Sequence, residues 1–443
     1  MNRDQPQRLQ RHHKRSLPRV LLVTQNDGYP DDTRVALECE CLNKAGCQVC
    51  VICPTGVSNR LYENVHGVHV YRYPRPWDVR GLLGYVWEYS YCLTWSFLLC
   101  LYISIRRGFD VLQARTPPDF HVLLGWFFKL FGKKYVVEML DLCPELYRAR
   151  SNGEGSRLIR RVLSWFERRN CQAADYVIAS SESQRRVMVE RGGTPADRCC
   201  LVRNTPDPRF LEPIEPIASL REDGRFIVGY MGLIGVQDRV DLLIRALNYL
   251  KYTMGRDEFL AVIVGSGPEL GEVKRLCSEF GIDRQVMFTG YLTGEDLVRH
   301  VASFDVGVVP DPSNEYNDTC SMCKIMNYMA VAIPVVGFDL VENHLTSGDT
   351  ALYASGNCAD DLARQIARLM DSGELCMQLG QAGKKRLLEQ FTWEHAKPDL
   401  LKAYCSLWPD SRALEHELAK DVGSIGETNQ SVHLNFERGG TPA

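Results

Sequence analysis

The sequence lacks two features that would point to particular classes of protein. Positive and negative charges nearly balance, with 52 Lys and Arg, 55 Asp and Glu and a net charge of −3. Nothing in the overall charge therefore favours a nucleic-acid partner. The N-terminal stretch MNRDQPQRLQRHHKRSLPR is polar and basic and has no apolar segment. We expect no secretory signal there and predict a disordered basic arm over residues 1–17.

Cysteine is frequent, yet its spacing is not that of a metal site or a disulfide framework. The 17 cysteines are odd in number and scattered, which favours free thiols in a reducing cytoplasm. Cys47, Cys50 and Cys53 recur at intervals of three on a predicted strand, where such intervals alternate between faces. Cys320 and Cys323 form a CxxC without a second pair at zinc-site spacing. We expect small buried side chains and no metal.

A long apolar segment is present, but it does not read as a membrane span. Tyr85–Ile105 is rich in aromatic residues and has no charge from Tyr89 onward. It is slightly short for a span and is interrupted by Ser and Thr. We predict a helix that is buried or lies at an interface.

Strand-like and helix-like segments alternate twice along the chain. The first set opens with the almost wholly apolar strand RVLLVT, and the second starts at Arg225. A proline-rich stretch between them marks a linker. Buried strands alternating with helices are typical of a parallel sheet covered on both faces. We predict an α/β fold of two tandem Rossmann-like, doubly wound domains, with the ligand in a cleft at the carboxyl ends of both sheets.

The predicted boundaries follow this alternation. The N-terminal domain covers residues 18–205 and the C-terminal domain covers residues 206–395. A last helix spans residues 396–408. Residues 409–443 are polar and without periodicity, so we predict a disordered tail.

The stretch from Asp305 to Phe338 contains the best candidate for an anion site. It is predicted as a strand, a polar loop, a short helix and another strand. A loop that opens a helix offers free backbone N–H groups and the positive end of the helix dipole. Asp318, Ser321 and Lys324 lie where this loop would hold a phosphorylated ligand. Any α/β protein has several such loops, so the position of this loop alone does not establish that it binds a ligand.

Glycines and polar residues follow several other predicted strands. Gly232, Gly235, Gly265 and Gly267 allow close approach of a phosphate or base, or only tight turns. Neither pair completes a dinucleotide-binding fingerprint.

The predicted N-terminal domain offers its own candidates. Asp27 and Gly28 follow the first strand, and Arg34 opens the next helix. Asp141 and Glu145, four residues apart, would serve acid–base chemistry or sugar binding, or would simply start the helix at Pro144.

These segments together resemble one known family. The carriers of the resemblance are RVLLVT, DDTRV, TPPD, DLCPELY, ADYVIASSES, VRNTPD, VGYMGLIGVQDRVDLLIRAL, VGSGPEL, VMFTGYL and KIMNYMAVAIPVVGFDL. From about residue 19 to residue 404 the chain resembles the retaining glycosyltransferases of family 4, which have the GT-B fold. The segment KIMNYMA with the following PVV is the most telling part.

The resemblance implies a division of labour between the domains. The C-terminal domain would bind a nucleoside-diphosphate sugar, the N-terminal domain would bind the acceptor, and the last helix would cross back. Catalysis would retain the anomeric configuration without a metal or another cofactor. We predict catalytic roles for Asp141, Glu145 and Lys324.

The other predicted contacts divide between donor and acceptor. The donor contacts are Gly232, Gly235, Gln237, Arg239, Gly265, Gly267, Tyr291, Asp318, Ser321, Met322 and Asn327. The acceptor contacts are Asp27, Gly28 and Arg34.

The resemblance also bears on partners and location. Family members often use lipid-linked acceptors at the cytoplasmic face of a membrane, which would give Tyr85–Ile105 and the segment 126–129 an interfacial role. Packing in the core is the alternative, and both interpretations stay open here. We expect a cytoplasmic protein, with peripheral contact to the inner face of the plasma membrane as an option.

The chain departs from the family pattern at three places. Thr319 and Asn327 stand where the family has a pair of Glu residues, and MLDL stands where relatives have HHDL. Of the cations expected after the first strand of the C-terminal domain, only Arg239 is near. The main hypothesis is a sugar transferase in polysaccharide, glycoconjugate or natural-product assembly. The alternatives are a catalytically silent relative that binds a nucleotide or a partner and, less favoured, a sugar-nucleotide epimerase.

Overall fold

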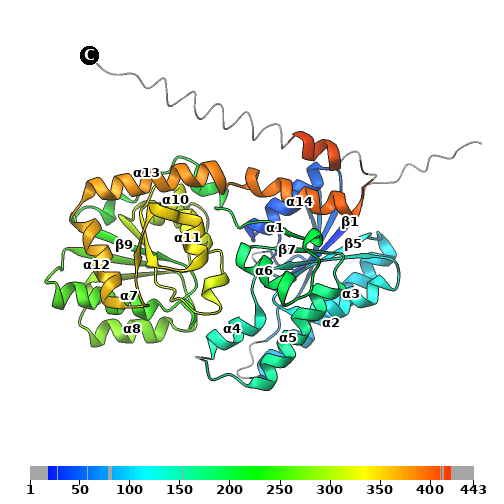
Figure 1. Cartoon of the computed structure of the whole chain (residues 1–443), viewed down its shortest axis with the longest axis horizontal. Coiled ribbons are helices and arrows are strands. Elements are labelled where there is room, and N and C mark those ends of the chain that lie inside the picture. The colour runs from blue at the N-terminus through cyan, green and yellow to red at the C-terminus, as the bar shows by residue number, and fades with distance from the viewer. Residues whose placement is uncertain are drawn as a thin grey trace, which may run out of the picture.

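The structure is a computed structural model with two lobes that lie side by side (Figure 1). It describes residues 18–26, 28–56, 58–77, 82–151, 153–409, 411 and 414–420. The predicted arm over residues 1–17 lies outside this range. Each lobe is a predominantly parallel sheet with helices on both faces, so the predicted doubly wound α/β architecture is confirmed.

The N-terminal lobe holds an eight-stranded sheet in the order β3-β4-β2-β1-β5-β6-β7-β8. Its strands are β1 (Arg19–Val23), β2 (Gln48–Pro54), β3 (Tyr62–Val65), β4 (Val68–Tyr73), β5 (Val111–Thr116), β6 (Lys134–Met139), β7 (Tyr176–Ala179) and β8 (Cys199–Leu201). All neighbours are parallel except the edge pair β3 and β4. Strand β3 was not predicted, because none of its side chains is buried and YENV has no apolar run.

The C-terminal lobe holds a six-stranded sheet, all parallel, in the order β11-β10-β9-β12-β13-β14. Its strands are β9 (Phe226–Met231), β10 (Phe259–Val264), β11 (Val286–Gly290), β12 (Val306–Val309), β13 (Val335–Phe338) and β14 (Ala351–Ala354). The strand order reverses between β9 and β12. Loops at such a reversal leave a crevice at the carboxyl edge of the sheet.

Helices cover both sheets. In the N-terminal lobe they are α1 (Thr33–Lys44), α2 (Leu82–Arg106), α3 (Val122–Lys129), α4 (Cys143–Arg150), α5 (Arg157–Ala173) and α6 (Glu182–Glu190). The later helices are α7 (Val240–Asn248), α8 (Leu270–Glu279), α9 (Gly294–Ala302), α10 (Cys323–Ala330), α11 (Val341–Ser347), α12 (Ala359–Met370), α13 (Gly373–Gln390) and α14 (Trp393–Leu407). Helix α11 was not predicted, since it buries polar residues such as Glu342 and Asn343 and shows no apolar stripe.

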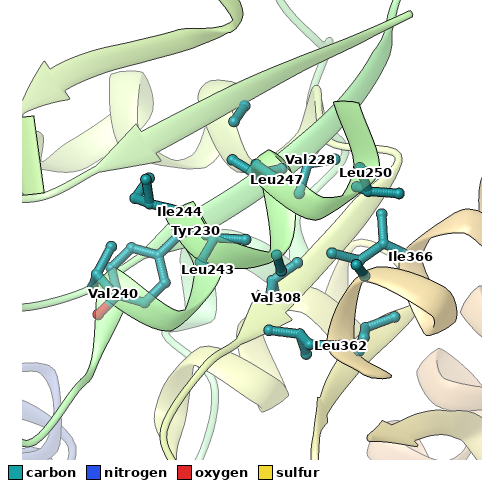
Figure 2. Packing of buried hydrophobic residues seen from close by; sticks show 14 of the residues in the cluster. Val228, Tyr230, Val240, Leu243, Ile244, Leu247, Leu250, Val308, Leu362 and Ile366 are labelled. Atoms are coloured by element: carbon teal, nitrogen blue, oxygen red, sulfur yellow. The ribbon is translucent and has the colours of Figure 1, made fainter. Parts of the chain in front are cut away.

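Apolar side chains of sheet and helices interlock in the C-terminal lobe (Figure 2). Val228 and Tyr230 of β9 pack with Leu243 of α7 and with Leu362 and Ile366 of α12. These side chains are all fully buried. Burial of this kind removes apolar area from water and holds the strand ends in place. All 17 cysteines are free thiols and most are buried.

The last helix belongs physically to the N-terminal lobe (Figure 1). Leu400, Leu401 and Tyr404 of α14 lie in the core that also contains Val35 of α1. The Tyr404 hydroxyl donates to Oε1 of Gln113, 2.5 Å away, inside this core. Helix α14 therefore ties the end of the second lobe to the first.

One boundary prediction is wrong in part. Residues 414–420, placed in a disordered tail, are helical. Leu414 is fully buried in the N-terminal core. The segment is too short to show periodicity, so the sequence gives no sign of it. Residues 421–443 lie outside the described range.

The predicted segment 85–105 forms α2, a helix with two apolar sides. Cys92, Cys100 and Ile103 face the core, whereas Tyr85 and Ile105 are exposed. Among the described residues, none of the helices combines the length and the apolar character needed to cross a membrane.

The close packing of β9 yields a stability test. A Cβ added at Gly229 would lie 1.9 Å from Cδ2 of Phe304, so we expect Gly229→Ala to destabilise the protein by about 1–3 kcal/mol through overpacking. At Gly271 in α8 no heavy atom lies within 4 Å of the added Cβ. Gly271→Ala should therefore stabilise by about 0.5–1 kcal/mol. Thermal unfolding of both variants checks the prediction, and an equal shift in both would contradict it.

Candidate active site

A pocket of about 460 Å³ lies between the lobes, where the carboxyl ends of both sheets meet. One side is formed by the loops after β1, β6 and β8 together with Arg115 at the end of β5, and the other side by the loops after β9 and β12. The pocket therefore opens at the point of strand-order reversal in both sheets, where open α/β sheets bind ligands.

The structure brings seven of the predicted site residues to this pocket. They are Arg34, Asp141, Gln237, Ser321, Met322, Lys324 and Asn327. The predicted residues that do not line it are Gly28, Glu145, Gly232, Gly235, Arg239, Gly265, Gly267, Tyr291 and Asp318. Asp27 lies outside the described residues.

Lys324 is the cation of the C-terminal wall, and it is already paired. Its Nζ lies 2.9 Å from Oδ2 of Asp311 and 3.7 Å from Oδ1 of Asp238. The ammonium also lies 4.9 Å from the centre of the Tyr230 ring. Burial, opposed by Lys324 and reinforced by Asp311, raises the pKa of Asp238 to about 6. Two carboxylates thus share one ammonium, and any further anion competes with them.

The start of α10 offers hydrogen-bond donors beside Lys324. Met322 is the N-cap residue and makes no side-chain cap to the first turn. The hydroxyl of Ser321 is buried without a hydrogen-bond partner and lines the pocket. An uncapped helix start with an unpaired buried hydroxyl suits a bound anion.

Two glycines let the neighbouring loops approach each other. Gly265 has φ +145°, and a Cβ there would lie 1.9 Å from the carbonyl oxygen of Gly232. Gly267 is crowded in the same way, with Ile234 O at 2.3 Å. These glycines shape the edge of the C-terminal sheet without lining the pocket. The predicted need for glycine after β9 and β10 thus has a steric cause.

Buried ion pairs form the N-terminal wall. Arg34 Nε lies 3.1 Å from Glu38 and also pairs with Glu138. Arg115 bridges Asp32 at 2.9 Å and Glu138 at 3.1 Å. Burial, together with the Glu138 charge, raises the pKa of Glu38. Burial disfavours ionisation of Glu138 too, but Arg115 and Arg34 outweigh it and lower its pKa. Of these two carboxyl groups, Glu38 therefore takes up a proton more readily than Glu138.

Arg34 retains capacity for a ligand. Its Nη1 donates to Val202 O at 2.9 Å and to Asn204 Oδ1 at 3.2 Å. Its Nη2 is buried and has no hydrogen-bond partner within the described part of the chain. A guanidinium with one unused edge in a pocket suits an oxygen-rich ligand.

Polar contacts across the pocket join the lobes. The Tyr316 hydroxyl donates to Oδ1 of Asp141 at 2.7 Å. Asn327 Oδ1 accepts from the backbone N–H of Asp207 at 3.1 Å, beyond the last strand of the first lobe. The Ser181 hydroxyl donates to the carbonyl of Thr319 at 2.6 Å. Asn327 and Thr319, where the family has Glu, thus take part in joining the domains.

Three predicted residues have partners outside the pocket, and a fourth is exposed. Glu145 pairs with Arg191, and Arg239 pairs with its neighbour Asp241 at 2.8 Å. Asp318 accepts from the Ser313 hydroxyl at 2.9 Å. Tyr291 is 78% exposed. Glu145 and Arg239 were predicted from their position after a strand, but their ion pairs with Arg191 and Asp241 hold their side chains outside the pocket.

Sequence reasoning missed most of the charged residues of the pocket. Arg115, Asp207, Asp238 and Asp311 all line it without having been predicted. Two of them lie at the carboxyl end of a β-strand, since Arg115 belongs to the end of β5 and Asp311 follows β12 directly after Pro310. Examining every polar residue near each strand end would have found Arg115 and Asp311. Asp207 lies in the linker and gave no such signal.

Comparison with known proteins agrees with this arrangement. Residues 32–205 match the model of the Glycosyl transferase 4-like domain, and residues 225–372 match the model of Glycosyl transferases group 1. A glycosyltransferase of Methanocaldococcus jannaschii is 23% identical over 77% of this chain and 86% of its own length. The 2-deoxystreptamine glucosyltransferase of Streptomyces kanamyceticus is 24% identical over 74% of this chain and 86% of its own.

Solved structures share the fold. Sucrose-phosphate synthase from Thermosynechococcus elongatus superposes with a TM-score of 0.71 at 18% identity, over 88% of this chain and 99% of that one. WaaG, a glycosyltransferase involved in lipopolysaccharide biosynthesis, gives 0.65 at 14% identity over 86% and 98%. With both domain models matched in order and two Rossmann-like lobes facing one pocket, the chain belongs to the GT4-like glycosyltransferases of the GT-B fold.

Proposed function

We propose that this glycosyltransferase moves a hexosyl unit from a nucleoside-diphosphate sugar to an acceptor, with retention of configuration and without a metal. The observation that carries the proposal is one wall of the interlobe pocket. There the uncapped start of α10, the unpaired Ser321 hydroxyl and Lys324 lie together. These groups would stabilise the negative charge that develops on the leaving diphosphate.

The remaining predicted residues take roles around this wall. Gln237, Met322 and Asn327 would contact the donor. On the opposite wall the unused edge of Arg34 and the carboxylate of Asp141 would hold the acceptor. The Tyr316 bond to Asp141 fixes that carboxylate at the boundary of the two lobes. Donor and acceptor would therefore meet between walls whose relative position is set by hydrogen bonds.

The relatives support a role in glycoconjugate or natural-product assembly. WaaG acts in lipopolysaccharide biosynthesis, and the Streptomyces relative is named for glucosylation of 2-deoxystreptamine. We propose the same broad class of pathway for this chain, on the cytoplasmic side of the membrane.

A silent relative is the second candidate, because the one ammonium of the C-terminal wall already has two carboxylate partners. In an active enzyme the donor has to displace one of these carboxylates from Lys324, or one of them has to take up a proton from the solvent when the donor binds. In a catalytically silent relative, the ion pairs of Lys324 with Asp311 and Asp238 would only stabilise the folded structure.

Donor binding is the first test. Purified protein is mixed with UDP-, GDP-, ADP- and dTDP-sugars without added metal, and thermal shift and released nucleoside diphosphate are measured. We expect one donor to stabilise the protein and to be hydrolysed slowly. Analysis of the transferred anomer by NMR then tests retention. Absence of binding by every donor would contradict the proposal.

Lys324 is tested as a pair with its counter-ion. Lys324→Met with Asp311→Asn removes the ammonium and its nearer counter-ion. Asp238, whose pKa Lys324 lowers, can then take up a proton and does not have to stay as an unpaired charge. We expect donor affinity to fall by about tenfold or more, as for loss of a charged hydrogen bond, with folding preserved. The exposed Lys274→Met on the same lobe is the matched control. Unchanged donor affinity in the folded double variant would favour the silent relative.

Asp238 predicts a pH dependence of donor binding. Its pKa is about 6, so above that pH its carboxylate repels a diphosphate beside Lys324. The donor diphosphate is esterified at both ends and keeps its charge over this range. Affinity should rise as pH falls from 8 towards 6 and then level off. Asp238→Asn should bind more tightly at pH 8 and lose this slope, and an unchanged slope would rule the mechanism out.

We also propose that α2 and α3 contact an anionic membrane surface. Ile105 is 83% exposed, and Leu130 and Phe131 are 81% and 64% exposed. Exposed apolar residues of this size next to cations are typical of peripheral membrane contact. We expect Ile105→Glu with Phe131→Glu to reduce co-sedimentation with phosphatidylglycerol vesicles. Met377→Glu with Leu388→Glu, on the other lobe, is the control, and equal losses would refute the contact.

A further inference from the structure

Glu342 is a buried carboxylate of α11, in the C-terminal lobe, to which the proposed transfer gives no role. The residue is 1% exposed. Its Oε1 accepts from the backbone N–H of Ser183 at 2.8 Å, and its Oε2 accepts from Nη1 of Arg203 at 3.2 Å. Ser183 belongs to α6 and Arg203 follows β8, so both donors come from the N-terminal lobe. Each oxygen of this carboxylate is therefore bound across the boundary between the lobes.

The start of α6 suits an anionic partner, and it faces α11 across this boundary (Figure 1). The free N–H groups and the dipole of a helix favour negative charge at its first turn. The hydroxyl of Ser181 caps α6 by accepting from the Gln184 N–H at 3.0 Å, and it donates to the carbonyl of Thr319 at 2.6 Å. The next free N–H, that of Ser183, donates to Glu342. The first turn of α6 thus holds both the loop at Thr319 and helix α11.

The residue after Arg203 touches both walls of the interlobe pocket. Nδ2 of Asn204 donates to the carbonyl of Ser321 at 2.8 Å, and its Oδ1 accepts from Nη1 of Arg34 at 3.2 Å. Ser321 lies just before α10 on the C-terminal wall, and Arg34 belongs to α1 on the N-terminal wall. The ion pair of Arg203 with Glu342 restrains the backbone beside Asn204. A contact outside the pocket therefore bears on the spacing of its two walls.

Helix α11 is itself anchored in the C-terminal lobe. Arg386 of α13 donates to two carbonyls in the last turn of α11, at 2.8 and 2.9 Å. Its guanidinium lies 5.6 Å from the centre of the Phe391 ring, and the guanidinium of Arg203 lies 5.8 Å from the same centre. Phe391 ends α13, just before α14 crosses to the N-terminal lobe. The Glu342 carboxylate is thus presented from a fixed support, close to the crossing point of the chain.

We infer that Glu342 is a positioning residue, which holds the two lobes in the arrangement that sugar transfer needs. This role rests on the proposed function, and Glu342 does not itself line the pocket. If the lobes move apart, the carboxylate loses both of its donors at once. Its charge-assisted hydrogen bonds therefore favour the closed arrangement. Through Arg203 it also restrains Asn204, and a displacement of the walls by about 1 Å is enough to slow a reaction between them strongly.

The first test measures backbone hydrogen exchange of the full chain without any ligand. We expect residues 319–323 to exchange about tenfold faster in Glu342→Ala, because this loop loses its support against α6, while β9 and β10 exchange as in the wild type. Asp339→Ala is the matched control, since Asp339 lies on the same segment with a side chain that is 62% exposed. If Glu342→Ala does not fold, Arg203→Gln removes only the ion pair. Unchanged exchange of the loop in the folded variant, or equally faster exchange throughout both lobes, would overturn the role.

The second test measures release of nucleoside diphosphate from the UDP-, GDP-, ADP- and dTDP-sugars in the same variants. We expect kcat of Glu342→Ala to fall by about tenfold or more, with KM for the donor changed by less than about threefold, because the donor wall lies on one lobe. Glu342→Gln keeps an oxygen for the Ser183 N–H and should lose less. A lower melting temperature with unchanged kcat, or a rise in KM alone, would show a merely structural residue. The exchange test needs no donor, so its result is readable even if every donor fails to bind.

Discussion

Pairing of buried charge is the constraint on which the interlobe site depends. Lys324 is largely buried beside Asp311 and Asp238. Arg34 and Arg115 are likewise largely buried, and both pair with the fully buried Glu138. An isolated ion in such a place would be very costly, whereas a paired one is tolerated. Each wall thus carries cations without being strongly positive. A charged substrate would therefore have to compete with these internal partners.

The second constraint is the geometry of parallel sheets. All loops that follow a parallel strand leave the sheet at the same edge, and the two edges face each other across the pocket. Helix α14 stabilises this arrangement because Tyr404 is buried against Gln113, and Gln113 in turn donates to Glu38 at 2.9 Å. The core that holds the last helix is thus in contact with the ion pairs that support Arg34.

The departures from the family pattern have a structural use. Asn327 accepts a hydrogen bond from the linker and Thr319 accepts one from Ser181. Met139, where relatives have His, is fully buried in the core. The residues that replace the expected acids and imidazole therefore contribute to packing and to domain contact. In the transfer that we propose, catalysis would depend on the loop amides, Ser321, Lys324 and the carboxylate of Asp141.

The sequence by itself determined the doubly wound architecture and much of the C-terminal wall. Apolar runs of strand length are local signals, and the segment 305–338 became β12, α10 and β13 nearly as predicted. Strand β3 and helix α11 were not predicted from the sequence, because β3 buries none of its side chains and α11 buries polar side chains. We predicted Lys324, Ser321 and Arg34 as site residues because they lie in segments that follow predicted strands, and all three line the pocket.

Only the tertiary structure decided which charges meet. Asp141 reaches Tyr316 from 175 positions away, and Lys324 meets Asp311 across a loop. Glu145 forms an ion pair with Arg191, and no spacing in the sequence indicates this pairing. An apolar groove lined by Arg150 joins α2 to α4 and α5, although strands β5 and β6 lie between them in the sequence. Periodicity reports the surroundings of a residue along its own element, whereas ion pairs and cavities depend on how distant elements pack.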